Sequence, residues 1–400
     1  MQLVEQHVIK PNSPFWQVVD TAAFASKNLY NLALYEMRQK FFVSGFTHSY
    51  ESLYHLVKAS DAYKGLPAKV SQQVLKGLDK AWKGYFAAHR EWQKDPSKFL
   101  SEPKIPHYKD KTAGRNVLTY TIQAISSKLL RIGQVAPSGL SGVIIKTKQT
   151  AVDCVRIVPK KTHYVVEVIY TKEIEPADLD YTFAAGIDLG LNNLAVIASN
   201  KSGFQPVVVN GRPLKSINQF YNKRKAELQS ILGSEKAKSH RIDRLTDRRN
   251  RRINHYLHAT SRKVVDLLVA DGIGMVVVGK NNGWKQEIGI GKRNNQNFVS
   301  IPHARFIEML TYKAELVGIK VVLTEESHTS KCSFLDMEPI CHQEKYAGKR
   351  IKRGLFRSSM GKLINADLNG AYNIIRKVAP GAFSQGVEGV VVHPLPLGIN

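Results

Sequence analysis

An aspartate inside an apolar run places the strongest constraint on how this chain folds. Asp188 interrupts the apolar run 184–189, and a second apolar run, 194–198, follows a short polar turn. A carboxylate among apolar residues is unfavourable unless a positive group or hydrogen bonds meet it. Asp188 could simply cap a hairpin turn, since Asp and Gly are ordinary turn residues. A second motif far downstream, 365–375 with Asp367 near its start, instead favours two parts of one metal site.

Length and charge narrow the class of protein. The 400 residues exceed the usual size of one core and favour two or three domains. Lys and Arg outnumber Asp and Glu by 58 to 33, and the resulting net charge of +25 suits a polyanion, with nucleic acid ahead of an anionic membrane surface. The chain has no run of about 18 apolar residues and no apolar start typical of a signal peptide. We therefore expect an intracellular protein without a membrane partner.

The N-terminal part divides into a helical region and a strand-rich region. Apolar residues recur at helical spacing over 15–42 and 70–92, and the Pro-containing stretch 93–111 indicates an irregular crossing. Short alternating runs at 118–122, 143–145, 155–158 and 164–170 resemble the run that opens the chain, 3–9. This spacing predicts a small β-barrel beside a helical lobe.

The order of elements in the C-terminal half fits one architecture. Three strands joined by tight turns come first, then a long helical region, a short fully apolar strand, a helix that Gly318 ends, and a last strand. The corresponding ranges are 184–189, 194–198, 206–209, 214–270, 275–278, 302–317 and 319–323. An antiparallel meander followed by helix-separated parallel strands predicts the RNase H-like fold. In that fold, carboxylates collect at the ends of the central strands and on a final helix, where Asp188 and Asp367 fall.

Phosphodiester hydrolysis explains why such a site needs several carboxylates. The reaction requires an activated water and a stabilised leaving oxyanion, which two divalent ions about 4 Å apart can supply together. Magnesium prefers oxygen ligands and needs only a few carboxylates besides the scissile phosphate. We therefore expect two Mg²⁺ ions, with Asp188 and Asp367 as two of three acidic ligands.

At this point the chain resembles a known family. The segment 186–190 around Asp188, the string 329–331 (Thr-Ser-Lys) and the segment 365–369 around Asp367 together resemble TnpB, the transposon-encoded RNA-guided nuclease ancestral to type V CRISPR effectors. The resemblance implies an α/β and α+β multidomain chain: an RNase H-like (RuvC) nuclease domain, a helical recognition lobe and a small β-barrel wedge domain. It implies a wedge of 1–10 and 113–180, a recognition lobe of 11–112, a RuvC domain of 181–378 with a basic helical insertion 214–270, and a tail of 379–400.

The third acid of the family is absent from its usual position. The resemblance implies a Glu at the end of the strand 275–278, where this chain has Gly279. The next parallel strand lies about 4.8 Å away and leads into Glu325 and Glu326, and alternation along a strand lets only one of them face Asp188. We favour Glu326, because the string from Glu326 to Lys331 resembles relatives that also lack the usual Glu. Glu325 is the substitute, Glu287 is a weak candidate, and both strand-end acids could instead be solvated charges.

Zinc ligands are also fewer than the family implies. Two Cys-x-x-Cys pairs would form a tetrahedral site, but the segment 329–362 offers only Cys332, Cys341 and His342. We therefore predict no structural zinc and describe this segment as a degenerate zinc-finger-like region. Together with Cys154, the cysteines are too few for a disulfide framework and favour thiols in a reducing compartment.

Two basic stretches predict contacts with nucleic acid. The helical stretch 241–252 keeps an apolar face and turns a dense cationic face outward, and a second basic run follows the Cys-containing segment. Such side chains contact mostly phosphates, so they position a duplex without reading its sequence. The candidate nucleic-acid-binding residues are Arg241, Arg244, Arg248, Arg249, Arg251, Arg252, Lys349, Arg350, Lys352 and Arg353.

The resemblance implies an RNA-guided DNA endonuclease of a transposon. A guide RNA from the transposon end would pair with target double-stranded DNA next to a short motif that the protein reads. Asp188, Glu326 and Asp367 would be both the catalytic and the metal-binding residues of one magnesium-dependent site. We expect a monomer in the prokaryotic cytoplasm, associated with the nucleoid when bound to DNA. The alternatives are a nuclease-inactive RNA-guided DNA-binding protein acting as a repressor, and a transposase or resolvase that joins strands itself.

Overall fold

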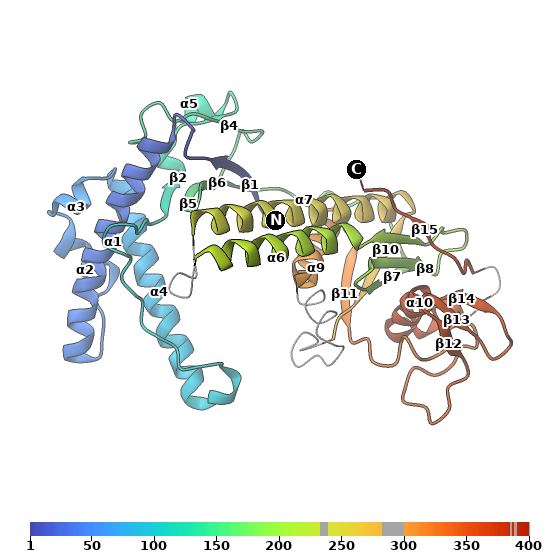
Figure 1. The fold of residues 1–400 in the computed structure, drawn as a ribbon. Coiled ribbons are helices and arrows are strands. Elements are labelled where there is room, and N and C mark those ends of the chain that lie inside the picture. The colour runs from blue at the N-terminus through green and yellow to red at the C-terminus, as the bar shows by residue number, and fades with distance from the viewer. Residues whose placement is uncertain (233–238, 282–299, 385, 388–389, 400) are drawn as a thin grey trace. The chain divides into compact units, whose positions relative to one another are not determined.

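The structure is a computed structural model, and it describes residues 1–232, 239–281, 300–384, 386–387 and 390–399. The chain forms two compact units, Met1–Lys172 and Glu173–Asn400. No helix of the described residues combines the length and the apolar character that a membrane span requires. Figure 1 shows the elements of each unit.

The first unit is built from a helical part and a sheet around one core. Its helices are α1 (Trp16–Ser44), α2 (Tyr50–Val57), α3 (Asp61–Lys64), α4 (Ala68–Lys94) and α5 (Ser127–Leu130), with the 3₁₀ turns η1 (Pro96–Lys98) and η2 (Ile122–Ala124). The two long helices match the predicted ones to within a few residues. The short helix α2 was not predicted, although its N-cap, Ser49, accepts a hydrogen bond from the Ser52 N–H.

The strands of the first unit pair into an antiparallel sheet. Its order is β1 (Gln2–Ile9), β6 (Tyr164–Thr171), β5 (Cys154–Pro159) and β2 (Leu118–Thr121), and a separate two-stranded sheet joins β3 (Gln134–Val135) and β4 (Ile145–Lys146). Within the described residues no pairing joins β1 to β2, so the predicted closed barrel stays a prediction. Apolar residues of both the helices and the sheet form one continuous core.

The second unit contains a six-stranded sheet. Its order is β11 (Lys320–Thr324), β10 (Ile273–Gly279), β7 (Asp180–Leu189), β8 (Asn193–Ser199), β9 (Val207–Asn210) and β15 (Leu395–Pro396). The strands β7, β8 and β9 form an antiparallel meander, whereas β10 runs parallel to β7 and β11 runs parallel to β10. From β11 to β9 this is the strand order of the RNase H-like fold that the sequence predicts. The tail adds the short parallel edge strand β15, which the sequence did not reveal.

Helices cover both faces of this sheet, and the alternation of side chains along β7 decides which face each residue joins. The helices α6 (Arg212–Leu232), α7 (His240–Ala270) and α9 (His303–Glu315) belong to one side, where α7 and α9 share a core with Ala185 and Ile187. The helix α10 (Ala366–Val378) covers the opposite face, where it shares a core with Ala184 of β7. Asp188 follows Ala184 by an even number of residues along β7, so its side chain points to the same face of the sheet, toward α10.

Three short strands precede α10. The strands β12 (Lys349–Lys352), β13 (Leu355–Arg357) and β14 (Leu363–Asn365) form an antiparallel sheet, and β14 leads directly into α10. The 3₁₀ turn η3 (Pro380–Phe383) follows the helix. This arrangement brings the basic run 349–353 close to the N-terminal end of α10, because the Ala366 N–H donates to the Gly354 carbonyl.

Candidate active site

The first acid, Asp188, lies near the end of β7 against the backbone of α10. A Cβ added to Gly370 on α10 would lie 2.8 Å from Asp188 Oδ2, and one added to Gly186 on β7 would lie 2.1 Å from the Ala371 carbonyl oxygen. Both glycines are therefore required by the close approach of strand and helix. This close packing holds the Asp188 carboxylate beside the first turns of α10.

The second acid, Asp367, lies in the first turn of α10. The side chain of Asn365 caps the helix by accepting hydrogen bonds from the Asp367 and Leu368 N–H groups. A carboxylate in the first turn is also favourable toward the helix dipole. The two neighbouring residues thus have separate functions: Asn365 fixes the start of the helix, and Asp367 projects a carboxylate from it.

The third acid predicted from the sequence, Glu326, occupies the space beside Gly279. The two residues belong to adjacent strands, since Gly279 at the end of β10 pairs with Thr324 at the end of β11. A Cβ added to Gly279 would lie 2.3 Å from Glu326 Oε1, 2.5 Å from Cγ and 2.8 Å from Cδ. The Glu326 carboxyl group therefore fills the volume that a side chain at position 279 would take.

The other two acids considered are not placed in this way. Glu325 is exposed and contributes its backbone carbonyl to a hydrogen bond from Lys377 Nζ. Glu287 lies outside the described residues. Of Glu325 and Glu326, the two residues that follow β11, the geometry favours Glu326, which is also the residue preferred from the sequence.

An amide positions Glu326. Asn281 Oδ1 accepts from the Glu326 N–H at 2.8 Å, and Asn281 Nδ2 lies 3.5 Å from Glu326 Oε2. The other carboxylate oxygen, Oε1, is buried and has no hydrogen-bond partner among the described residues. A buried acceptor without a donor is unfavourable, and a bound cation is one group that would satisfy it.

Burial shifts Asp188 and Glu326 toward their protonated forms. Burial, reinforced by the carboxylates of Glu326 and Asp367, raises the pKa of Asp188 well above its usual range, and the Arg350 guanidinium opposes this rise. Burial also raises the pKa of Glu326 to about 7, with the Lys377 ammonium group opposing it. Carboxyl groups whose pKa is raised by burial are typical of functional sites, and a bound cation would return them to their ionised forms.

The carboxylate of Asp367 is engaged on both of its oxygens. Arg350 Nη2 on β12 donates to Oδ1 at 3.0 Å, and Asn193 Nδ2 at the start of β8 donates to Oδ2 at 2.8 Å. Arg350 was predicted to contact a phosphate backbone. In this structure its guanidinium group instead pairs with one of the predicted metal ligands.

The three acids line one cavity of about 610 Å³. Its lining also includes Arg350, Arg353 and Asn281. In the part of the chain that the structure describes, no group of three or more His, Cys, Asp or Glu side chains is arranged to hold a metal ion. The fold thus brings the predicted ligands into one cavity without assembling them into one cage. Oxygen donors alone, with one orphaned carboxylate oxygen among them, are a donor set that fits a hard divalent cation.

The basic face of α7 has the predicted arrangement, with one exception. Five of the six arginines of its stretch 241–252 are exposed, whereas Ile242, Ile253 and Leu257 are buried. The exposed ones are Arg241, Arg244, Arg248, Arg251 and Arg252. The exception is Arg249, which is half-buried and donates to Asn218 Oδ1 and to the Ser300 carbonyl. Its contacts make Arg249 a residue that joins α7 to its neighbours rather than a free phosphate ligand.

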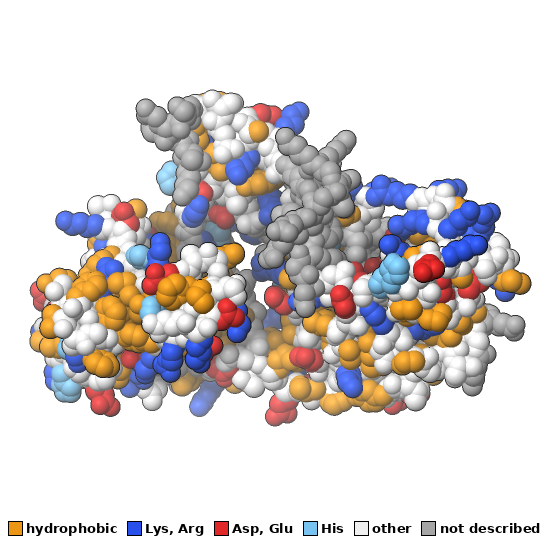
Figure 2. Space-filling view, turned by 90° about the horizontal axis from the view of Figure 1, so that it is seen from below, with side chains coloured by type: hydrophobic (Ala, Val, Ile, Leu, Met, Phe, Trp, Pro, Cys, Tyr) orange, Lys and Arg blue, Asp and Glu red, His pale blue; other side chains and the backbone are white. Residues whose placement is uncertain are grey.

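The second basic run lies on the β12–β13 hairpin, where Lys349, Lys352 and Arg353 are exposed. Figure 2 shows Lys and Arg side chains gathered on the right of that view, over the part of the second unit that holds β12, β13 and β14. The cavity with the three acids is therefore bordered by positive charge from this hairpin, since Arg350 and Arg353 both line it.

Hydrogen bonds, rather than two Cys pairs, hold the degenerate zinc-finger-like segment onto α10. The fully buried amides of Asn369 and Asn373 both donate to the carbonyl of Cys332, and Asn373 also donates to that of Thr329. The Glu338 carboxylate accepts from the backbone N–H groups of residues 333 and 347. Cys332 is buried and Cys341 is exposed, and both are free thiols.

Reasoning from the sequence missed Asn193 and Asn281, the two amides that hold the acids in place. The only available signal was their position, since each lies within five residues of Asp188 or Gly279 at a strand boundary. Lys377 was missed too: it joins α10 to the Glu326 segment by donating to the carbonyls of Glu325 and Ser327.

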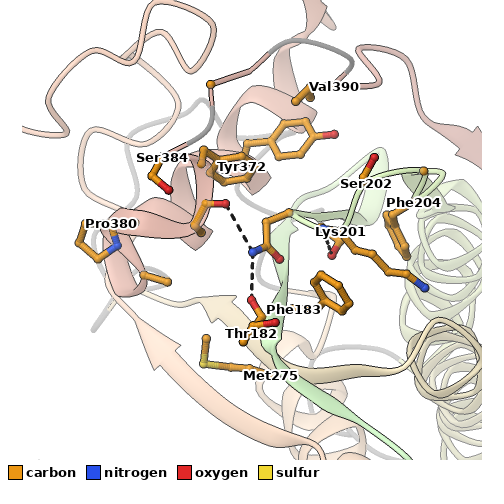
Figure 3. A pocket seen from close by; sticks show the side chains of 18 of the residues that line it. Thr182, Phe183, Lys201, Ser202, Phe204, Met275, Tyr372, Pro380, Ser384 and Val390 are labelled. Carbon is orange, nitrogen blue, oxygen red and sulfur yellow. Dashed lines mark hydrogen bonds between the residues drawn. The ribbon is translucent and has the colours of Figure 1, made fainter.

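A second cavity, of about 710 Å³, lies at the other end of β7 (Figure 3). Thr182, Phe183, Lys201, Met275 and Tyr372 are among the side chains around it. Its described lining contains no acid, so it offers no carboxylate chemistry. The smaller cavity with the three acids is therefore the candidate active site.

Strand order and acid placement together define the second unit as an RNase H-like domain of mixed α/β structure with carboxylates at the sheet end. Two family models match the chain: OrfB_IS605, described as a probable transposase, over residues 163–285, and the Cas12f1-like TNB domain over 303–374. These matches support a similarity to TnpB-type proteins.

Similar proteins carry related names. The TnpB-like protein ORF457 of Acidianus two-tailed virus is 25% identical over 395 residues, covering 88% of this chain and 81% of that protein. The CRISPR-associated endodeoxyribonuclease Cas12f2 of Micrarchaeota archaeon (strain CG1_02_47_40) is 26% identical over 231 residues, covering 54% of this chain but only 40% of Cas12f2.

Solved structures resemble the chain more distantly. The mini-RNA-guided endonuclease CRISPR-Cas_phi3 aligns with a TM-score of 0.48 at 10% identity, over 98% of this chain and 93% of that one. The Cas12f1-sgRNA-target DNA complex aligns with a TM-score of 0.39 at 15% identity, over 93% and 98% of the two chains.

Proposed function

We propose that this protein is a transposon-encoded, RNA-guided endonuclease that cleaves double-stranded DNA next to a short motif. The observation that carries the proposal is the position of Glu326, whose carboxyl group fills the space beside Gly279 in the cavity that Asp188 and Asp367 also line. An RNase H-like nuclease needs a carboxylate there, and this chain supplies one from the neighbouring strand.

Each residue of the cavity has a role in this proposal. Asp188, Glu326 and Asp367 would hold two Mg²⁺ ions, which when bound would activate the attacking water and stabilise the leaving oxyanion. Asn281 keeps Glu326 directed toward Gly279, and Asn193 orients Asp367. Burial raises the pKa of Glu326 to about 7, so a cation that binds this carboxylate would displace any proton from it.

The proposed partners are a guide RNA and target DNA. The net charge of +25 and the five exposed arginines of the stretch 241–252 support a polyanionic partner. The relative Cas12f2 is named an endodeoxyribonuclease, and its name supports DNA as the substrate class. We propose a monomeric protein that acts in the prokaryotic cytoplasm.

A nuclease-inactive DNA-binding protein is the second candidate function. Two observations favour it: residue 279 is a glycine, and no three acids of the described residues are arranged as a metal site. Such a protein would keep the basic surfaces and the fold, yet it has no use for buried carboxylates beside DNA phosphates. The cost of burying Asp188 and Glu326 therefore favours the nuclease.

One experiment separates the two candidates. The full-length protein, purified with its co-expressed RNA, is given Mg²⁺ and matched double-stranded DNA, and wild type is compared with Asp188→Ala, Glu326→Ala and Glu325→Ala. We expect wild type and Glu325→Ala to cut, and the other two to bind without cutting. Binding without cutting by wild type would establish the inactive protein instead.

A further inference from the structure

The charge of Arg350 within the carboxylate cavity is not used by the proposed function. Its guanidinium group pairs with Asp367 Oδ1 at 3.0 Å, while the two side chains remain 50% and 30% exposed. The rise in the pKa of Asp188 is also opposed by Arg350, so its charge acts on more than one acid of the site. Arg350 thus faces the residues that are proposed to bind metal.

The backbone of Arg350 is fixed, whereas its side chain is free to move into solvent. On β12 it pairs with Phe356, a core residue that in turn pairs with Ile364 one strand further on. This pairing and the bond from the Ala366 N–H to the Gly354 carbonyl tie the hairpin to the start of α10. The side chain itself is half exposed while it contacts Asp367.

The two donors on Asp367 differ in what they do to an incoming cation. Asn193 is neutral and orients Oδ2 without repelling a positive charge. Arg350 carries a full charge and engages Oδ1, so it opposes a divalent ion at the same carboxylate. A guanidinium group also binds phosphate oxygens through two parallel hydrogen bonds, which gives Arg350 an alternative partner once a nucleic acid enters the cavity.

We propose that Arg350 competes with a divalent cation for Asp367 and is drawn away by the phosphates of a nucleic acid, so that metal binding strengthens when nucleic acid is present. Arg350 is then a positioning residue that couples the two binding events. This inference rests on the proposed function, because it needs a metal site at Asp188, Glu326 and Asp367. The coupling is reciprocal, as all linked binding equilibria are.

Mn²⁺ binding to the full chain, measured by electron paramagnetic resonance without nucleic acid, tests the competition. We expect Arg350→Gln to bind Mn²⁺ about two- to fivefold more tightly than wild type, which is the range that an exposed ion pair supports. Arg353→Gln is the matched control, because Arg353 lines the same cavity and, in the described part of the chain, forms no ion pair with Asp367. Arg350→Lys keeps the charge and should stay near wild type. Melting temperatures without metal confirm that each variant is folded.

The second arm adds a short single-stranded oligothymidine, with Asp188→Asn reporting Mn²⁺ held by the oligonucleotide alone. The oligonucleotide should tighten Mn²⁺ binding to wild type, so that the Mn²⁺ affinities of wild type and Arg350→Gln become equal. Equal affinities of wild type and Arg350→Gln without the oligonucleotide, with Asp188→Asn weakened, would overturn this inference and leave the proposed function standing. If the oligonucleotide does not reduce the difference in Mn²⁺ affinity between wild type and Arg350→Gln, the proposed coupling is wrong. Equal Mn²⁺ affinity in wild type and Asp188→Asn would refute the metal site, and with it both proposals.

Discussion

Replacing Gly279 by Ala should inactivate the protein although it removes no chemical group. The new Cβ would lie 2.3 Å from Glu326 Oε1, whereas non-bonded carbon and oxygen atoms stay about 3.5 Å apart, so the carboxylate has to move by about 1 Å. A displacement of this size at a reacting centre lowers a rate by about 100-fold. We therefore expect Gly279→Ala to lose about two orders of magnitude in DNA cleavage.

The same substitution should have little effect on stability. Gly279 has no positive φ, so Ala fits its backbone, and Ala in a strand is favoured over Gly by roughly 0.5–1 kcal/mol. The displaced group is the end of a flexible side chain whose Oε1 has no hydrogen-bond partner among the described residues to lose. The expected change in the free energy of unfolding is within about 1 kcal/mol.

The assay is single-turnover cleavage of matched DNA with guide RNA and Mg²⁺, paired with a thermal melt of each variant. Gly381→Ala is the control, because a Cβ at Gly381 meets no atom within 4 Å. A reciprocal variant, Glu326→Ala with Gly279→Glu, returns the carboxylate to the end of β10 and should recover at least tenfold over Glu326→Ala. Cleavage by a folded Gly279→Ala protein at the wild-type rate would refute the assignment of Glu326 to the site.

Three further predictions follow from the described contacts. The pKa of Glu326, raised from 4.5 to about 7, means that its protonated form stabilises the metal-free protein below pH 4.5 and that this stability is lost as the pH rises through about 7. Urea unfolding in EDTA should show that the free energy of unfolding falls by about 3 kcal/mol at most between pH 4.5 and about 7, and that this fall is smaller in Glu326→Gln. The same pH dependence in Glu326→Gln as in wild type would count against the raised pKa of Glu326. Asn373→Ala should lower the free energy of unfolding by about 2–3 kcal/mol, because it removes two buried hydrogen bonds, to the carbonyls of Thr329 and Cys332. EDTA should leave the wild-type melting temperature unchanged if no zinc holds this segment. Arg249→Ala should lower the melting temperature, whereas Arg248→Ala should leave it unchanged and weaken nucleic-acid binding with a smaller salt dependence; the reverse pattern would exclude the assignment of Arg249 as a structural residue.

The RNase H-like sheet could be predicted because its strands are buried on both faces. The strands β7, β8 and β10 read as nearly continuous apolar runs, and the predicted ranges match these strands to within a few residues at each end. The strand β12 gave no such signal. All four of its residues are exposed and three are Lys or Arg, so the sequence predicted only a basic run there.

The acids of the site were visible in the sequence, but their neutral and positive neighbours were not. Asp188 was conspicuous as a charge in an apolar run, whereas Asn193 and Asn281 are ordinary polar residues at strand boundaries. Arg350 was assigned to phosphate because a sequence shows the charge of a residue and not its partner. Only the pairing of β12 with β13, and of β13 with β14, reveals that this arginine reaches Asp367.

The strand register explains why Gly279 and Glu326 depend on each other. Gly279 pairs with Thr324, so the chain needs only two more residues beyond β11 to bring a side chain back over the end of β10. A Glu at both positions would crowd two carboxylates into one volume, and a Glu at neither would leave the cavity with only Asp188 and Asp367. The sheet therefore specifies where a carboxylate has to lie, not which strand supplies it. For the proposed nuclease, the glycine on one strand is what allows the glutamate of the next strand to occupy the site.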